Sequence, residues 1–317
     1  MRLTFRPAQR RDFDLSYVGR YYVVRAGAEN LGALQREWES LRSNPSTISM
    51  VVEDQERDPH ARGVGFAQAV FVTDAFAENT AGGSIPYVNL LVAPTGILTP
   101  DGVRDANSGP GLNVLITHWI WKQEVLDNES SRRVRDYLTR QFLTYYAGFK
   151  LRQILLEVFG DEALQMAVNA GFRLRTAYAS YFREHPRPAP DLHPYLTGIT
   201  RQEARDSEGS LVSQAFVYTP PCFYFKQHEQ ELLCHALLGY SDEELTEPLC
   251  VSLAAVRKRW AGIYDRVATV NPGLLPASGD GTRGAEKRRD LLAYLRDHPE
   301  ELRPVERPAR TATAVSG

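Results

Sequence analysis

Residues 228–267 constrain the fold of this chain most, because they carry three successive helical patterns, each with its own start and stop signals. Leucine and alanine recur at helical spacing up to Gly239, a residue suited to the left-handed turn that ends a helix. Ser241 and Glu244 form a Ser-x-x-Glu capping box for a second helix, and Ser252 is placed to cap a third. The apolar stripe of the third helix consists of Val256, Trp260, Ile263 and Val267. The segment therefore predicts a compact unit of three short helices.

The opposite face of the third predicted helix carries small and basic side chains. Three adjacent cations lie in its first half, and alanines beside them let the backbone approach a surface closely. A basic triplet is usually only a solvated helix face, but behind two shorter helices it suits a helix that enters a DNA groove between phosphates. The candidate DNA-binding residues are Ser252, Ala254, Ala255, Arg257, Lys258 and Arg259.

The order of these signals resembles the LuxR-type helix-turn-helix of bacterial transcription regulators. That family has a Gly-x-(Ser/Thr) corner, an acidic second helix and a third helix that opens with Ser-x-x-(Thr/Ala)-Val-(Lys/Arg). This chain supplies them in order at residues 239–241, 242–245 and 252–257. It departs from the pattern at Pro248, which should bend or shorten the second helix, and at Cys250, where the family commonly has glycine. The resemblance implies double-stranded DNA as a partner, with Arg257 and Arg259 near it.

The composition of the chain limits where contacts with DNA can lie. The chain has 317 residues, 43% of them hydrophobic, which is enough for two domains with cores of their own. Its formal net charge is -2, so any DNA contact has to be local. Its three cysteines form no C-x-x-C pair, so we expect no metal site and a reducing compartment. With no signal region and no apolar run near about 18 residues, we expect a cytoplasmic protein without membrane contact.

Residues 1–185 alternate between strand and helix patterns, which predicts an α+β fold class for the chain as a whole. A Gly/Pro/Asp-rich stretch at 94–111 is expected to be a long loop, and Ser130 or Ser131 is expected to cap a long amphipathic helix. His118 is expected to be a core or sheet-face residue. The other expected strands are 2–6, 21–25, 47–53, 64–72, 87–92, 113–121, 153–158 and one from 173, and the other expected helices are 31–41 and 161–168.

The strand-helix-strand pattern at residues 151–178 resembles the C-terminal half of the GNAT (general N-acetyltransferase) superfamily. In that superfamily a strand leads to a helix that ends in Gly-Phe before the next strand, and here Gly171 and Phe172 occupy those places. The preceding hairpin, the long helix and the opening Phe5-Arg6-Pro7 agree with it. The resemblance implies a GNAT-like fold over residues 1–185 and, with it, transfer of an acyl group from acyl-CoA to an amine.

The signature residues of that chemistry are only partly present. The family holds the pyrophosphate of acyl-CoA on a "(Q/R)-x-x-G-x-(G/A)" loop before the long helix. Residues 122–131 contain no glycine and carry Glu124, Asp127 and Glu129, which would repel phosphate. The tyrosine that often serves as general acid is replaced by Ala167. Glu157 remains a weak candidate for the base, since a lone glutamate in a sheet more often faces solvent.

These observations favour a DNA-binding transcription regulator whose GNAT-like domain is degenerate and serves regulation, through a small-molecule effector or self-association, with no cofactor. The alternative is an N-acyltransferase that uses acetyl-CoA or another acyl-CoA. A third possibility is a protein-interaction module in which both halves only bind partners. No other catalytic motif is present in the sequence. The regulator is expected to be a homodimer, with Leu291 and Leu295 of a helix at 285–297 as the candidate interface. The expected organisation is a GNAT-like domain at 1–185, a linker and docking segment at 186–225, a helix-turn-helix domain at 226–300 and a disordered tail at 301–317.

Overall fold

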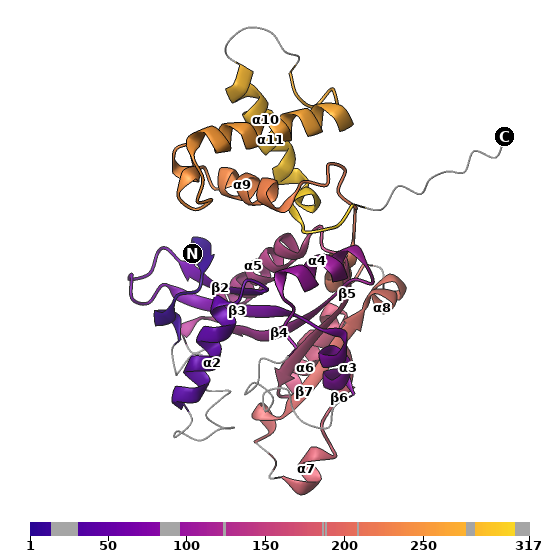
Figure 1. Cartoon of the computed structure of the whole chain (residues 1–317). Helices are drawn as coiled ribbons and strands as arrows, with labels where there is room; N and C mark the ends of the chain where they lie inside the picture. Colours follow the sequence, from indigo (N-terminus) through magenta and orange to yellow (C-terminus); the bar gives the residue numbers. More distant parts are fainter. Residues whose placement is uncertain are drawn as a thin grey trace, which may run out of the picture. The chain divides into compact units, whose positions relative to one another are not determined.

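The computed structural model describes residues 1–13, 31–82, 96–122, 125–185, 187, 189–207, 209–276 and 283–307. The chain divides into two compact units (Figure 1). The first unit comprises Met1–Tyr146 and Lys150–Phe216, and the second comprises Ala147–Phe149 and Val217–Gly317. In the part of the chain that is described, no helix is both long enough and apolar enough to span a membrane.

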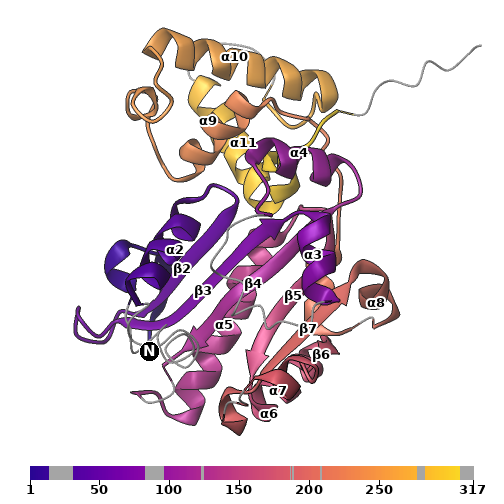
Figure 2. The ribbon, with the colours of Figure 1, turned by 60° about the horizontal axis from the view of Figure 1, so that its bottom comes forward.

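The first unit is built on a mixed sheet of seven strands in the order β1-β2-β3-β4-β5-β7-β6 (Figure 2). Neighbouring strands are antiparallel except β4 and β5, which are parallel and are joined through a long helix. The strands are β1 (Leu3–Pro7), β2 (Thr47–Asp54), β3 (Gly63–Val72), β4 (Leu112–Trp121), β5 (Leu151–Phe159), β6 (Arg173–Thr176) and β7 (Pro194–Thr200). The sheet and its helices agree with the α+β class that the sequence predicts.

Helices cover both faces of the sheet, with α2 (Leu31–Ser43) and α5 (Asn128–Tyr146) on opposite sides (Figure 1). On the α2 face, Trp38 packs with Phe66 and Val70 of β3. On the α5 face, Val134 and Leu138 pack against β2 and β3. Gly65 allows this close approach, because a Cβ there would lie 2.9 Å from Cγ1 of Val134. The remaining helices of this unit are α3 (Asp74–Ala81), α4 (Pro100–Ser108), α6 (Asp161–Ala170), α7 (Tyr181–Glu184) and α8 (Arg201–Asp206), with 3-10 turns η1 (Arg10–Asp12), η5 (Pro190–Leu192) and η6 (Leu211–Phe216).

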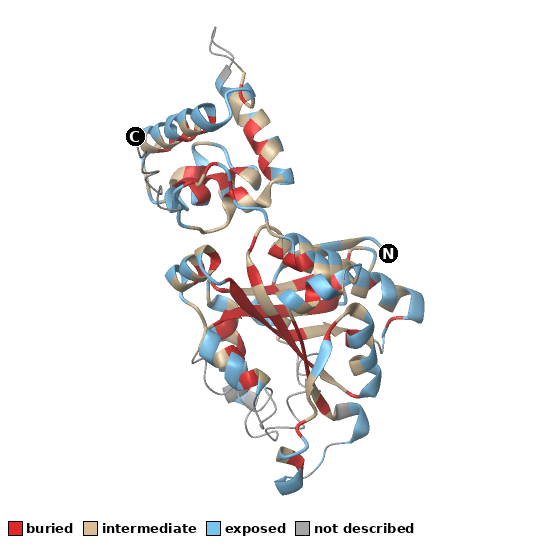
Figure 3. Cartoon of the chain, turned by 90° about the vertical axis from the view of Figure 1, so that its right-hand side faces the viewer, coloured by how far each residue is buried: buried red, intermediate tan, exposed pale blue. Residues whose placement is uncertain are grey.

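The second unit is helical. It contains α9 (Gln227–Leu237), α10 (Leu253–Val270) and α11 (Arg283–Asp297), with 3-10 turns η7 (Glu244–Thr246) and η8 (Pro299–Leu302). The Asp242 carboxylate accepts hydrogen bonds from Nε1 of Trp260 (3.0 Å) and Nη1 of Arg288 (2.8 Å), so it ties the turn before η7 to both α10 and α11. In both units the buried positions gather on the central strands and on the inner stripes of the helices (Figure 3).

Several expectations about the helical patterns are confirmed. The Ser241 and Glu244 capping box forms, and Ser252 caps α10 by accepting a hydrogen bond from the Ala255 N–H at 3.3 Å. The predicted apolar stripe of α10 is buried. The second helix of the pattern, however, is only the 3-10 turn η7, because Pro248 denies the segment an α-helical continuation. The unit therefore has the predicted order of elements with a shortened middle one.

The predicted boundaries need correction. The linker at 186–225 is wrong, since β7 lies within it and pairs with both β5 and β6, and the first unit extends to Phe216. The loop at 94–111 contains α4. The tail does not begin at residue 301, because Glu301 is buried in η8 and accepts hydrogen bonds from the N–H groups of Cys222 and Phe223. The strands expected at 21–25 and 87–92, and the tail beyond Arg307, lie outside the described residues.

The predicted serine cap of the long helix and the predicted dimer interface are also wrong. The cap of α5 is Asp127, whose carboxylate accepts a hydrogen bond from the Ser130 N–H, so the helix begins before either predicted serine cap. Leu291 and Leu295 are 0% and 1% exposed and belong to the core of the helical unit. They cannot serve as a dimer interface while that core is intact.

Candidate functional site

The two parallel strands at the centre of the sheet separate partway along their length. Backbone pairing between β4 and β5 ends at Ile116 and Leu156, although β4 continues to Trp121 and β5 continues to Phe159 beside β7. The next residues along the two strands are Thr117 and Glu157. These two residues therefore lie where the opening between the strands begins.

A β-bulge in β4 shapes this opening. Gln68 of β3 faces His118, whereas the next residue of β3 faces Ile116, so Thr117 is an extra residue with no partner in the register. The Thr117 hydroxyl turns back to β3 and donates to the main-chain oxygen and to Oε1 of Gln68, at 3.1 and 3.0 Å. The bulge thus lies at the start of the opening.

Buried polar side chains extend from β2 to β4 on the α2 face. Gln68 is 0% exposed and donates from Nε2 to Oγ of Ser49 at 2.7 Å. His118 is also buried, packs edge-on against Phe66 and lies 3.0 Å from the Thr117 hydroxyl through Nδ1. Burial lowers the pKa of His118 to about 3, so the ring is neutral at physiological pH. The neutral ring can orient the Thr117 hydroxyl. It is a poor general base, because accepting a proton would leave a charged imidazolium in a buried position.

Glu157 extends the same face to β5. Leu155 packs in the core on the α2 face, and alternation along a strand puts Glu157, two residues later, on that face as well. The Glu157 side chain is buried, and its Oε1 accepts a hydrogen bond of 2.6 Å from the hydroxyl of Tyr178. Tyr178 is 1% exposed and belongs to the same core cluster as Leu155. The arrangement gives a carboxylate of fixed position beside the opening.

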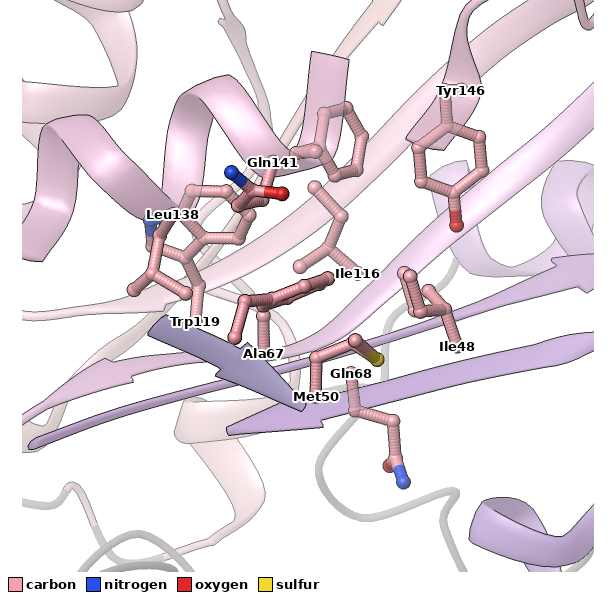
Figure 4. Close-up of a pocket in the computed structure, with 12 residues that line it drawn as sticks. Ile48, Met50, Ala67, Gln68, Ile116, Trp119, Leu138, Gln141 and Tyr146 are labelled. Carbon is pink, nitrogen blue, oxygen red and sulfur yellow. The ribbon is translucent and has the colours of Figure 1, made fainter. Parts of the chain in front are cut away.

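On the α5 side of the sheet, a small apolar pocket lies next to the same point (Figure 4). Its volume is about 20 Å³, enough for about one water-sized group. Figure 4 shows Gln68 extending to the opposite side of the strands from Leu138 and Gln141 of α5. The apolar walls include Ile48, Met50, Ala67, Ile116, Trp119, Leu138 and Phe142. Since Ile116 is also the last β4 residue paired with β5, the pocket adjoins the opening.

The site residues expected from the sequence fall into two separate groups. Glu157, the weak catalytic candidate, is buried and hydrogen-bonded, unlike the solvent-facing glutamate that is common in sheets. Sequence patterns missed Tyr178, and its φ of +52° explains why, because nothing local marks a tyrosine that is held in the left-handed region by tertiary packing. Gln68 and Thr117 were also missed. The sequence does contain a signal for Gln68 and Thr117, because both are polar residues within otherwise apolar strands.

The candidate DNA-binding residues lie on α10 of the helical unit. Arg257 and Lys258 are exposed and Arg259 is partly exposed, and none of the three forms an ion pair with any described residue. Ala254 is exposed and Ala255 partly so, and Gly262 on the same helix has open space beside it. Ser252 caps the helix at its exposed end. The structure thus brings the predicted residues to one helix, with three cations that form no ion pair among the residues described.

Comparison with known proteins gives matches among solved structures. No protein-family model and no curated protein sequence matches this chain. The N-acyl amino acid synthase FeeM from uncultured soil microbes is 12% identical, with a TM-score of 0.37 over 64% of this chain and 94% of that one. NAA60 of Arabidopsis thaliana in complex with acetyl-CoA is 15% identical, with a TM-score of 0.35 over 63% of this chain and 99% of that one. Mutant forms of the spermidine/spermine N-acetyltransferase SpeG from Vibrio cholerae are 13% identical, with a TM-score of 0.37 over 65% and 99%.

Proposed function

We propose that the first unit transfers an acyl group from a thioester to an amine, which is the alternative that the sequence left open. The observation that carries the proposal is the opening between β4 and β5 with Glu157 at its edge, buried and hydrogen-bonded to Tyr178. A buried carboxylate costs free energy unless it is satisfied, so its place beside the one break in the sheet's parallel pairing calls for a functional reason. Acyl transfer would use the opening to hold the acyl donor and the buried carboxylate to accept a proton.

The opening suits the donor. Past Ile116, the edge of β4 that faces β5 pairs with no strand among the described residues, so an extended amide-containing chain can lie along it. The pantetheine arm that carries acyl thioesters is such a chain. The thioester carbonyl would then lie near Thr117 and Glu157.

Glu157 suits the base. The amine nitrogen forms a bond with the thioester carbonyl carbon, the carbon–sulfur bond breaks, and the thiol leaves with a proton. The nitrogen loses a proton as it becomes an amide, and Glu157 is the carboxylate that lies beside the opening to receive it. The Tyr178 hydroxyl, 2.6 Å from Oε1, holds that carboxylate in one orientation. Neutral His118 contributes by orienting Thr117.

The test is turnover by the full-length protein. The protein is incubated with acetyl-CoA or S-acetyl-pantetheine and with a panel of amines: amino acids, a polyamine and peptides with a free N-terminus. Free thiol and the acetylated amine are both measured. We expect equal amounts of the two products, and we expect Glu157→Gln to lower the rate of formation of both about a hundredfold or more. Glu162→Gln, an exposed glutamate at the start of α6, is the matched control and should keep wild-type turnover.

We propose, as a second function, that the helical unit binds double-stranded DNA through α10. The observation that favours it is the group of Arg257, Lys258 and Arg259, which no acidic side chain neutralises within the described residues. Small residues on the same exposed face leave the helix backbone accessible. The two functions are compatible, since each belongs to a different unit. Gel-shift titration of a labelled duplex with the full-length protein tests this second proposal.

A further inference from the structure

A buried side-chain amide links three strands on the α2 face of the sheet. Gln68 of β3 is 0% exposed, and burial of an amide costs free energy unless the amide is hydrogen-bonded. Its Nε2 donates to Oγ of Ser49 on β2 at 2.7 Å, and its Oε1 accepts from the hydroxyl of Thr117 on β4 at 3.0 Å. An apolar side chain of the same shape would fill this position with no polar group to satisfy. The amide therefore calls for a reason other than packing.

The bulge in β4 is the feature that this amide holds. Gln68 pairs with His118 and the next residue of β3 pairs with Ile116, so Thr117 is the extra residue of the bulge. The Thr117 hydroxyl also donates to the main-chain oxygen of Gln68 at 3.1 Å, so one residue of β3 engages it through two oxygens. A bulge bends its own strand and increases the local twist. The bend in β4 is thus fixed from β3 at a single residue.

The bend begins where β4 leaves β5. The last pair between these strands is Ile116 with Leu156, and Thr117 and Glu157 would form the next pair if β4 continued without a bulge. Glu157 remains in the sheet through the pairing of β5 with β7. Because β7 holds β5 on its other side, the bend of β4 decides whether the two strands stay apart.

The hydrogen bonds around Thr117 run in one direction. Its hydroxyl has one hydrogen, which is directed at the two oxygens of Gln68. Nδ1 of His118 lies 3.0 Å from the same hydroxyl oxygen and must therefore be the donor in that contact. Because the ring is buried and neutral, His118 is the tautomer that carries its hydrogen on Nδ1. This tautomer gives an observable that does not depend on turnover.

From these contacts we infer that Gln68 is a positioning residue for the acyl donor: through Thr117 it keeps β4 bent, so that the opening between β4 and β5 is present before the donor binds. The inference rests on the proposed acyl transfer. Gln68 lies on β3, one strand removed from the opening, so it acts only through β4. No bond forms or breaks at Gln68 or Thr117. Their effect should appear in the use of the thioester and not in the use of the amine.

Steady-state kinetics of the full-length protein test the inference, with KM measured separately for the thioester and for the amine. Gln68→Met keeps the length of the side chain and removes both of its hydrogen bonds, and Thr117→Val keeps the shape and removes the hydroxyl. Thr117→Ser keeps the hydroxyl on a smaller side chain. Thr80→Val, which removes a buried hydroxyl from α3, is the matched control.

We expect Gln68→Met and Thr117→Val to raise KM for the thioester about tenfold or more, the effect of losing buried hydrogen bonds that preform a binding site. KM for the amine should stay within about twofold of the wild-type value. Thr117→Ser should bring KM for the thioester back to within about threefold of wild type. Thr80→Val should change neither constant.

Two NMR measurements test the network itself in the folded protein. The ring nitrogen shifts of His118 in isotope-labelled wild type should show the hydrogen on Nδ1, and a hydrogen on Nε2 would overturn the network. In Thr117→Val, those amides of residues 117–121 that exchange freely in the wild type should exchange more slowly, because β4 straightens and pairs further with β5. Unchanged or faster exchange would show that the Thr117 hydroxyl does not hold the strands apart.

The kinetic outcomes separate the inference from the proposed function. If the wild type turns over and both Gln68→Met and Thr117→Val keep its KM for the thioester, Gln68 does not position the donor, and the proposed acyl transfer stands. If KM for the amine rises as much as KM for the thioester, the fold is weakened in general and the inference fails again. If the wild type releases no thiol with any thioester and amine of the panel, the proposed function fails and the positioning role fails with it.

Discussion

The hydroxyl of Tyr178 donates a 2.6 Å hydrogen bond to the buried carboxylate of Glu157, and this bond joins β5 to the segment that follows β6. Tyr178 adopts a φ of +52°, a region that costs a tyrosine about 1–3 kcal/mol. Its ring is 1% exposed and packed in the core on the α2 face, so packing holds the hydroxyl in place against the local preference of the backbone. Strain that is retained at a buried carboxylate is typical of a functional site.

Replacing Tyr178 with phenylalanine removes only the hydroxyl that holds Glu157. We expect Tyr178→Phe to lower kcat about tenfold or more while KM for the amine stays near the wild-type value, because the carboxylate is misplaced and the opening is intact. Steady-state kinetics of thiol release provides the measurement, and circular dichroism verifies the fold. A wild-type kcat in a folded variant would show that the bond has no role in the reaction.

Glu203 predicts a dependence of stability on pH in the first unit. Burial alone would raise the pKa of Glu203, but hydrogen bonds from Arg175 and from the Thr200 N–H outweigh burial and lower it to about 2. The folded state therefore favours the carboxylate. The stability that this contributes is complete above the ordinary value of 4.5 and is lost as the pH falls toward 2.

Thermal unfolding across that pH range measures the effect. The unfolding midpoint of the wild type should fall steeply with decreasing pH, and that of Glu203→Gln should start lower and change less. Parallel curves for the two proteins would mean that Glu203 is not the group whose protonation weakens the fold.

How far the sequence anticipates the first unit depends on how local each signal is. Period-two patterns located β1, β2, β3, β4 and β5, and the helix at residues 161–168 ends at Gly171 with φ +110° as its Gly-Phe ending implied. His118 was correctly expected to be a core or sheet-face residue. The strand β7 was mistaken for a linker because prolines flank it, and only its pairing between β5 and β6 defines it. The contact of Tyr178 with Glu157 depends on the same tertiary pairing and has no local signal.

Cys250 predicts a stabilising substitution in the helical unit. Its φ of +49° lies in the left-handed region, where glycine carries no steric penalty and other residues pay about 1–2 kcal/mol. Cys250→Gly should therefore raise the free energy of opening of α10 by about 1 kcal/mol, measured by hydrogen exchange of its amides. Cys250→Ala is the matched control, because it removes the thiol and keeps the strain. Equal protection in the two variants would contradict the prediction.

Cys250 illustrates which features of the helical unit could be predicted from the sequence. The backbone of this chain is left-handed at position 250, where the resembled family commonly has glycine. Capping residues and the apolar stripe of α10 were read correctly, since both act within one helix. The burial of Leu291 and Leu295 within their own unit could not be predicted. Two leucines one helical turn apart give the same sequence pattern whether they pack in the core of their own unit or against a second subunit.

The basic face of α10 predicts salt-dependent binding. Arg257→Ala and Arg259→Ala should each weaken binding to duplex DNA and lower the slope of log affinity against log salt by about one unit. Lys258→Ala should cost roughly 1–3 kcal/mol, mainly on a preferred sequence. Arg296→Ala, which removes an exposed cation from α11, is the control and should leave the slope unchanged. If gel-shift titrations across salt show no effect of any α10 substitution, the triplet is a solvated face and the second function falls.

The measurement that tests the central claim most directly is thiol release by the full-length protein with the panel of amines, for wild type, Glu157→Gln and Glu162→Gln. Wild type and Glu162→Gln should release thiol in step with formation of the acetylated amine. Glu157→Gln should lose about a hundredfold or more of that rate, the contribution expected of a general base. Thiol release by Glu157→Gln at the wild-type rate, or no amine-dependent release by the wild type with any thioester and amine of the panel, would contradict the assignment of the opening between β4 and β5 as an acyltransferase site.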